Sequence, residues 1–259
     1  MMVLILLNRG EFRYRRSFTQ DIQEGLKRTM KTIGLIGGMS WESTVEYYRI
    51  INQEVGRRLG GLHSAKILMY SVDFGQLEPL MREGRWEVIG RHMATIAMTL
   101  EKGGADVILL CTNTVHKVAS WIENETTVPF IHIADATGEE VSRKGMKKVG
   151  LLGTRYTMEG DFYRNRLTEK FGLSVLIPPG EKRGIVNEVI FDELCKGVIS
   201  QSSKDQFIEI INELIAQGVE GTILGCTEIP MLINEADCPV PLFDTTSIHA
   251  VRAVDYALS

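Results

Sequence analysis

The size, composition and charge of the chain exclude several classes of protein. It has 259 residues, of which 44% are hydrophobic and 24% are charged, a composition typical of a globular protein with one large domain or two lobes. The net charge of -4, without a long basic stretch, argues against a nucleic-acid partner. No apolar run approaches the ~20 residues of a membrane span, so no membrane partner is predicted.

The four cysteines, Cys111, Cys195, Cys226 and Cys238, form no C-x-x-C pair, and histidine is scarce. The sequence therefore predicts no metal site. A disulfide framework is not expected at this chain length, and free thiols in a reducing cytoplasm are the default interpretation. Cys195 and Cys238 are interpreted as small structural residues.

The first 29 residues differ from the rest of the chain. They begin with an apolar run and continue with scattered arginines, without the basic start and the small-residue cleavage site of a signal peptide. At Met30, "MKTIGLIGG" reads as the start of a buried strand. We interpret residues 1–29 as a peripheral, dispensable extension, and the alternative is an anchor or a regulatory arm.

Short apolar runs alternate with helical patterns from Met30 onward. Residues 33–36 predict a buried strand, and "AKILMYSVDF" and "DVILLC" predict the next two. Between them, apolar residues recur at spacings of three and four over residues 41–55 and 89–100, as on one face of a helix. Continuous apolar strands separated by helices indicate parallel sheets covered on both faces.

The second half of the chain repeats the first. "IGLIGG" at 33–38 returns as "VGLLGT" at 149–154, and "KGGADVILLCT" at 102–112 returns as "QGVEGTILGCT" at 217–227. Both repeats occur at nearly the same offset along the chain. We interpret them as an internal duplication that gives two similar α/β lobes.

Each half ends a strand with a Cys-Thr pair, Cys111-Thr112 in the first and Cys226-Thr227 in the second. Ligands of open α/β sheets bind beyond the carboxyl ends of the strands, so lobes that face each other would bring both pairs to one cleft. Inverting a stereocentre next to a carboxylate requires one group that removes a proton and another that adds one on the opposite face. A thiol can do this where dipoles or cations bring its pKa, ordinarily ~8.5, toward neutrality.

The paired motifs "CTNTVH" and "GCTEIP", with "LIGGMSWESTVEYYRIIN", "HIADATGEE" and "LLGTRYTME", resemble the aspartate/glutamate racemase family. The likeness runs from Met30 to the C-terminus and is greatest to the bacterial L-aspartate/glutamate-specific branch. The resemblance implies two flavodoxin-like lobes with parallel sheets and the active site in the cleft between them. It also implies a cytoplasmic homodimer that racemises L-aspartate or L-glutamate with two acid/base residues and without PLP or any other cofactor.

The resemblance further implies how the lobes divide the chain. The strand in "VPLFDTT" is expected to return to the first lobe, and the strand in "VPFIHI" to cross into the second. The first lobe would then contain residues 30–127 and 240–259, and the second lobe residues 128–239.

The first catalytic position has two candidates, because this chain has one more residue than the usual Cys-Asn-Thr. Aligned on Asn113-Thr114, which we expect to bind the substrate carboxylate, the position is filled by Thr112; aligned on the strand, it is filled by Cys111. Side chains alternate along a strand, so only one of the two can point into the cleft. We predict Thr112, with Cys111 as the alternative, opposite Cys226.

The remaining predicted site residues bind substrate. Met39, Ser40 and Thr227 are expected to line the cleft, and Arg82 is the candidate partner of the distal carboxylate. His116 either orients the site or serves as a cap. Two other functions stay open: a maleate-type isomerase or decarboxylase that uses one cysteine, and a non-catalytic amino-acid-binding protein.

Overall fold

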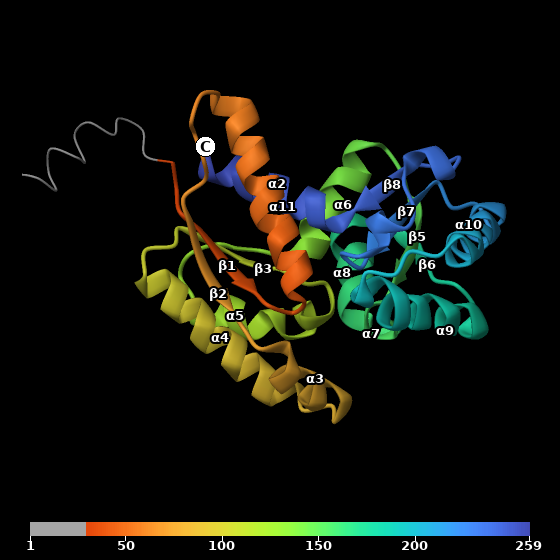
Figure 1. The fold of residues 1–259 in the computed structure, drawn as a ribbon, viewed down its shortest axis with the longest axis horizontal. Helices are drawn as coiled ribbons and strands as arrows, with labels where there is room; N and C mark the ends of the chain where they lie inside the picture. Colours follow the sequence, from red (N-terminus) through yellow and green to blue (C-terminus); the bar gives the residue numbers. More distant parts are fainter. Residues whose placement is uncertain (1–29) are drawn as a thin grey trace, which may run out of the picture. The chain divides into compact units, whose positions relative to one another are not determined.

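The computed structural model describes residues 30–259 (Figure 1). The predictions about residues 1–29 lie outside the described residues. No described helix is both long enough and apolar enough to span a bilayer. Residues 31–259 form one compact unit that contains two separate four-stranded sheets.

The first sheet has the strand order β2-β1-β3-β4, with every pair parallel. Helix α4 covers one face, and α2 and α11 cover the other (Figure 1). The central strands β1 and β3 are fully buried, as their continuous apolar sequences predict. The elements of this part of the chain, where η marks a short 3₁₀ or π turn, are β1 (Ile33–Gly37), α2 (Trp41–Leu59), β2 (Ile67–Ser71), α3 (Phe74–Arg82), α4 (Trp86–Lys102), β3 (Val107–Leu110), η1 (Thr114–Val118), α5 (Ala119–Glu125) and β4 (Phe130–Ile131).

The second sheet has the order β6-β5-β7-β8, again with every pair parallel. Its strands follow the same relative order as those of the first sheet, which confirms the duplication and the predicted α/β fold class. The elements are α6 (Ile133–Arg143), β5 (Lys148–Gly153), α7 (Arg155–Glu159), α8 (Asp161–Phe171), β6 (Ser174–Leu176), α9 (Gly180–Glu188), η2 (Val189–Glu193), η3 (Leu194–Lys196), α10 (Gln201–Ala216), β7 (Gly221–Gly225), η4 (Ile229–Met231), η5 (Glu235–Asp237), β8 (Leu242–Asp244) and α11 (Thr245–Ala257).

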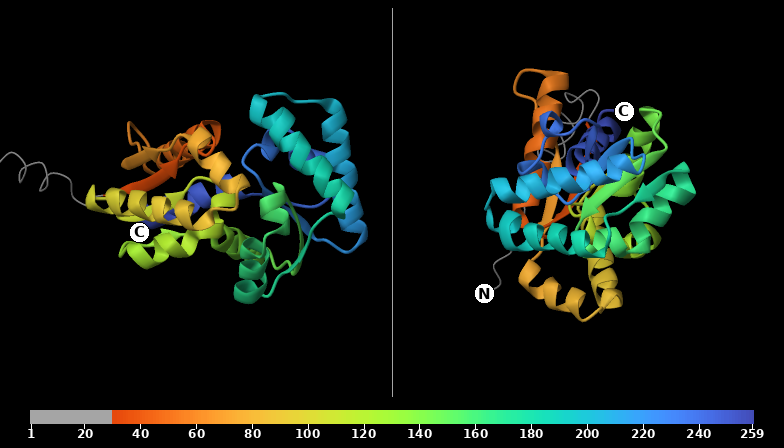
Figure 2. Two further views of the ribbon diagram at one scale, coloured as in Figure 1. Left: turned by 90° about the horizontal axis from the view of Figure 1, so that it is seen from below. Right: turned by 90° about the vertical axis from the view of Figure 1, so that its right-hand side faces the viewer.

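The predicted exchange of strands between the lobes is wrong. Strand β4 pairs with β3 in the first sheet, and β8 pairs with β7 in the second. The helices that follow these strands cross instead: α6 packs on α8 of the second lobe, and α11 packs on α2 of the first. Figures 1 and 2 show the C-terminal end of α11 among the first-lobe elements. The sequence repeats identified equivalent segments of the two halves correctly, but they do not specify which sheet each strand joins. The division into 30–127 plus 240–259 and 128–239 stays a prediction, although β4 lies in the first sheet and β8 in the second, so only the helices that follow these strands cross between the lobes.

Two fully buried tyrosines mark where the crossing helices pack. Tyr47 in α2 and Tyr163 in α8 are both inaccessible to solvent. Helices α6 and α11 also pack on each other, so the two lobes meet along a pair of crossed helices. This contact holds the facing sheet edges, and the strand ends on them, close together.

The turn after β1 brings Met39 and Ser40 to the facing edge of the first sheet. Gly38 has φ +91°, and a Cβ there would lie 2.2 Å from the carbonyl oxygen of Val72. Only glycine fits that conformation and that space. The side chain of Ser40 then caps the N-terminus of α2, and Thr154 caps α7 after the equivalent strand β5.

Candidate active site

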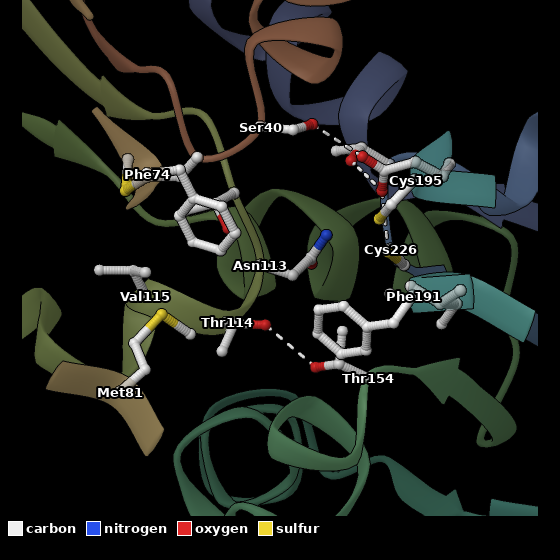
Figure 3. A pocket seen from close by; sticks show the side chains of 16 residues that line it. Ser40, Phe74, Met81, Asn113, Thr114, Val115, Thr154, Phe191, Cys195 and Cys226 are labelled. Carbon is white, nitrogen blue, oxygen red and sulfur yellow. Dashed lines mark hydrogen bonds between the residues drawn. The ribbon is translucent and has the colours of Figure 1, made fainter. Parts of the chain in front are cut away.

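A cavity of about 60 Å3 lies between the two lobes at the carboxyl ends of their central strands (Figure 3). Its volume holds a few water molecules. Seven of the predicted site residues line it: Met39, Ser40, Thr112, Asn113, Thr114, Cys226 and Thr227. The lining also includes residues that the sequence reasoning did not assign to the site: Phe74, Met81, Val115, Thr154, Ile190, Phe191, Cys195, Gly225 and Glu228.

The two candidates for the first catalytic position point to different sides of the strand end. Thr112 belongs to the cavity lining, whereas Cys111 does not and is completely buried. The backbone N–H of Cys111 still donates to Ile36 in the β1–β3 ladder. Burial alone raises the pKa of the Cys111 thiol far above its usual range. The alternation of side chains therefore presents a hydroxyl, and not a thiol, to the cavity on this side.

On the opposite side, the thiol of Cys226 faces a carboxylate instead of a cation. Its Sγ lies 2.9 Å from Oε2 of Glu228, to which it donates. Burial, followed by the charge of Glu228 and this hydrogen bond, raises the pKa of the Cys226 thiol well above its ordinary value. We expected dipoles or cations to lower this pKa. Cys226 is instead a protonated thiol with an adjacent proton acceptor.

Glu228 is the one charged residue in the cavity lining. Its carboxylate accepts hydrogen bonds from Cys226, from the hydroxyl of Thr227 at 2.6 Å and from the hydroxyl of Ser40 at 2.9 Å. Ser40 comes from the first lobe, so this carboxylate also joins the lobes. Among the described residues no lysine or arginine pairs with it. Its buried charge is balanced only by hydrogen bonds, an arrangement that favours a cationic ligand.

The amide of Asn113 presents an unused acceptor. Its Nδ2 donates to Thr245 Oγ1 at 3.0 Å, and the Thr245 hydroxyl donates to the carbonyl oxygen of Leu224 at 2.8 Å. Because the Thr245 hydroxyl donates to that carbonyl, it can only accept from Asn113, and this fixes the amide orientation. The buried Asn113 Oδ1 has no hydrogen-bond partner among residues 30–259. A buried acceptor without a donor is costly unless a ligand supplies one.

Three threonine hydroxyls form a cluster across the lobe interface. Thr114 Oγ1 of the first lobe lies 3.0 Å from Thr154 Oγ1 and 3.4 Å from Thr157 Oγ1 of the second (Figure 3 shows the shorter contact). The latter two are 3.3 Å apart. Thr114 and Thr154 both reach the cavity, where their hydroxyls can turn to donate to an anionic oxygen.

His116 holds the backbone of the first strand end. Its Nε2 accepts from the backbone N–H of Ile133 at 3.2 Å, so its Nδ1 carries the proton that it donates to the Thr112 carbonyl at 2.6 Å. Burial, followed by the neighbouring rings of His132 and His249, lowers its pKa well below the ordinary value. A neutral His116 thus orients Thr112 through its main chain and does not reach its hydroxyl.

Two residues lie elsewhere than the sequence reasoning placed them. Arg82 does not line the cavity; it is exposed and lies 3.4 Å from Glu78 on its own helix. Cys195, interpreted as structural, does line the cavity, and burial raises its pKa to about 12. Within residues 30–259 no group of three or more His, Cys, Asp or Glu side chains is arranged to hold a metal ion.

Comparison with known proteins identifies the family of the chain. Residues 36–253 match the family described as Asp/Glu/Hydantoin racemase. A broad-specificity amino-acid racemase of Bacillus subtilis is 27% identical over 167 residues, which cover 63% of this chain and 70% of that protein. A crystal structure of a candidate Asp/Glu racemase from Yersinia pestis is 55% identical with a TM-score of 0.85, and one of an aspartate racemase homologue from Pyrococcus horikoshii is 36% identical with a TM-score of 0.76. Each of these two alignments covers 89% of this chain and 100% of the other. The chain therefore belongs to the Asp/Glu/Hydantoin racemase family and is an isomerase, with amino-acid racemisation as the activity that the family supports.

Proposed function

We propose that this protein racemises L-aspartate or L-glutamate by two-base proton transfer at the α carbon, without a cofactor. The observation that carries the proposal is the single cavity that Thr112 lines from the first lobe and Cys226 from the second. Groups on opposite sides of a bound α carbon can serve its two faces. The homodimer and the cytoplasmic location implied by the resemblance remain predictions.

In this proposal Glu228 activates Cys226. The thiol transfers its proton to the carboxylate across the 2.9 Å contact, and the resulting thiolate removes the α proton of the substrate. Cys226 is then a thiol again, and Glu228 holds the first proton. The contact supports this role because it places a proton acceptor directly on the Cys226 thiol, whose pKa is raised by burial and by Glu228 itself, so the thiolate forms only by proton transfer to that carboxylate during the reaction.

The opposite face is served by a weaker group. The Thr112 hydroxyl has no accessible pKa, so it positions a water molecule that protonates the substrate carbanion. The hydroxide that this leaves takes the proton held by Glu228, which restores the starting state. His116 takes no part in the transfer, because both of its ring nitrogens bond main-chain groups.

The polar lining supports one orientation of the amino acid. The α-ammonium group would donate to the unused Asn113 Oδ1 and lie beside the carboxylate of Glu228. The α-carboxylate would accept from the hydroxyls of Thr114 and Thr154. This assigns the ammonium to Asn113, where the sequence interpretation placed the carboxylate.

A second substrate class is favoured by one observation. No lysine or arginine lines the inner cavity, so an amino acid with an uncharged side chain needs no partner that the cavity lacks. The broad-specificity relative from Bacillus subtilis belongs to the same family.

The test is deuterium exchange at the α carbon in D2O, measured separately from the L and D forms of aspartate, glutamate and several neutral amino acids. The proposal expects wash-in and loss of optical activity without added cofactor. Turnover of maleate without exchange into any amino acid would instead establish a one-cysteine isomerase. Thermal stabilisation by amino acids without exchange would establish a binding protein.

A further inference from the structure

A second, larger cavity lies beside the first and shares one residue with it. Its volume is about 550 Å3, and it is lined by both lobes, from α3 and η1 of the first to α7, α9 and η2 of the second. The shared residue is Phe191. We call the two spaces the inner cavity and the outer cavity.

Phe191 forms the wall between the two spaces. It lies in η2, a π-helical turn, and its ring projects toward Asn113 and Thr154 (Figure 3). The residue is 37% exposed, an unusual value for a phenylalanine that also lines a buried cavity. Single π-helical turns within helices often occur at functional sites. Among the described residues Phe191 alone lines both spaces, so a substrate that passes from the outer cavity to the inner cavity has to displace its ring.

The charged residues of the outer cavity favour an anion. Three are basic, Arg82, Lys117 and Arg155, and two are acidic, Glu78 and Glu159. Glu78 lies 3.4 Å from Arg82.

Lys117 and Arg155 supply the excess positive charge of the outer cavity. Glu159 is shared between Arg155 at 3.9 Å and Arg183 at 2.9 Å, so one positive charge of that group is not compensated. Lys117 makes no ion pair with a described residue, and its Nζ lies 4.4 Å from the ring centre of Trp86. The outer cavity therefore has positively charged donors, which are absent from the described lining of the inner cavity.

We propose that the outer cavity is a carboxylate-binding entrance site for small dicarboxylic acids, with Phe191 as the gate to the inner cavity. Lys117 and Arg155 bind the carboxylates. In its link to catalysis the inference rests on the proposed function, because an acidic amino acid would be captured here before it passes Phe191. Binding in the outer cavity itself needs no catalysis.

Succinate is a suitable probe, because it has two carboxylates and no α-ammonium group for the inner cavity. Trp86 reports on the site: Lys117 lies over its ring, and Tyr156 of the lining is edge-on to it with ring centroids 5.7 Å apart. We expect succinate to change the tryptophan fluorescence and to give a saturable heat in calorimetry. The fluorescence change should be absent in Trp86→Phe, whereas the heat should persist.

The variants Lys117→Glu and Arg155→Glu should each weaken succinate binding by roughly tenfold or more, as expected for the loss of a charge-assisted hydrogen bond. Lys144→Glu is the matched control, since Lys144 is also exposed and lies 5.1 Å from the ring centre of Phe243, outside both cavities. It should bind succinate normally. Absence of both heat and fluorescence change, or equal affinity in all three charge variants, would overturn the proposal. Inorganic phosphate that binds as tightly as succinate would overturn the assignment to dicarboxylic acids.

The gate is tested separately with Phe191→Trp and calorimetry. The larger ring should slow α-proton exchange of aspartate several-fold, by a larger factor than it changes the affinity for succinate. Unchanged exchange would show that substrates enter by another route. If the protein racemised no amino acid at all, the succinate measurements would still decide whether the outer cavity binds carboxylates.

Discussion

The two strand ends at the inner cavity descend from one repeated unit, yet they present different chemistry. After β3, the thiol of Cys111 is buried and the hydroxyl of Thr112 faces the cavity. After β7, the thiol of Cys226 faces the cavity and donates to Glu228. One side therefore has a titratable group with a proton acceptor, and the other has only a hydroxyl. The duplication places the two strand ends at equivalent positions. The side chain that faces the cavity is the second residue after β3 but the first residue after β7.

The largest effect is expected on the thiol side. Cys226→Ser should lower α-proton exchange by roughly 10²–10⁴-fold, since it removes a positioned acid/base group. Cys111→Ala is the matched change at the other strand end and should have much less effect on exchange, because its thiol lies outside the cavity. The rates of α-proton exchange, measured separately from each enantiomer, report the effect of both variants. If Cys111→Ala abolished exchange from one enantiomer while Thr112→Ala changed nothing, the two strand ends would be chemically alike and the comparison would fail.

A somewhat smaller effect is expected for Glu228→Gln, about 10²-fold on turnover, because the thiol loses its proton acceptor. The same change should shift the pH profile of Cys226 alkylation to lower pH, since the carboxylate is one cause of the raised pKa. Alkylation rates against pH, measured in Cys195→Ala so that only one cavity thiol is counted, provide the measurement. An alkylation profile that did not move would remove Glu228 from the proposed mechanism.

Thr112→Cys would make the two sides alike. We expect use of the D enantiomer to improve by roughly tenfold, because a thiol replaces a hydroxyl that cannot serve as a base. Thr112→Ser keeps the hydroxyl and is the control. The ratio of exchange rates from D and L substrate is the readout, and a ratio that stayed the same in Thr112→Cys would show that the hydroxyl does not limit the reaction.

The smallest effect concerns stability at the first strand end. Burial lowers the pKa of His249 to about 4 and of His132 to about 2, so both stay neutral in the folded protein at pH values where the unfolded chain binds protons. Stability should be fully present above the unfolded pKa of 6.5 and should fall as the pH decreases from there toward 4. For His249 the loss is on the order of 3 kcal/mol. Melting temperatures from pH 8 to pH 4 measure it, with exposed His63→Asn as a control that keeps the slope and His249→Asn as the variant that reduces it.

Much of this arrangement could be predicted from sequence, because it depends on local patterns. Apolar runs such as residues 107–110 predicted the strands, and the repeats "VGLLGT" and "GCT" predicted two like lobes with facing strand ends. Seven of the predicted site residues do line one cavity. Each of them follows a central strand directly, so strand position alone was enough to place it at the edge.

The remaining features depend on contacts between distant parts of the chain. The hydrogen bond that Glu228 accepts from Ser40 joins the two lobes, and neither position alone implies it. Phe191 reaches the site from a π-helical turn that has no signature in the sequence. Arg82 was predicted from proximity in sequence, but its side chain extends into a different space. The strand exchange was wrong for the same reason, since pairing depends on which sheet lies nearest in three dimensions.

Because α6 and α11 cross between the lobes, each half of this chain packs its last helix on the other half and not on itself. Each half encodes the helix that covers the other half's α2 or α8, as in two protomers that have exchanged their last segments. A single copy of the repeat would therefore reach this architecture only as a swapped pair. Because both copies belong to one polypeptide, the side chains at the two strand ends can differ, as Thr112 and Cys226 do at the inner cavity.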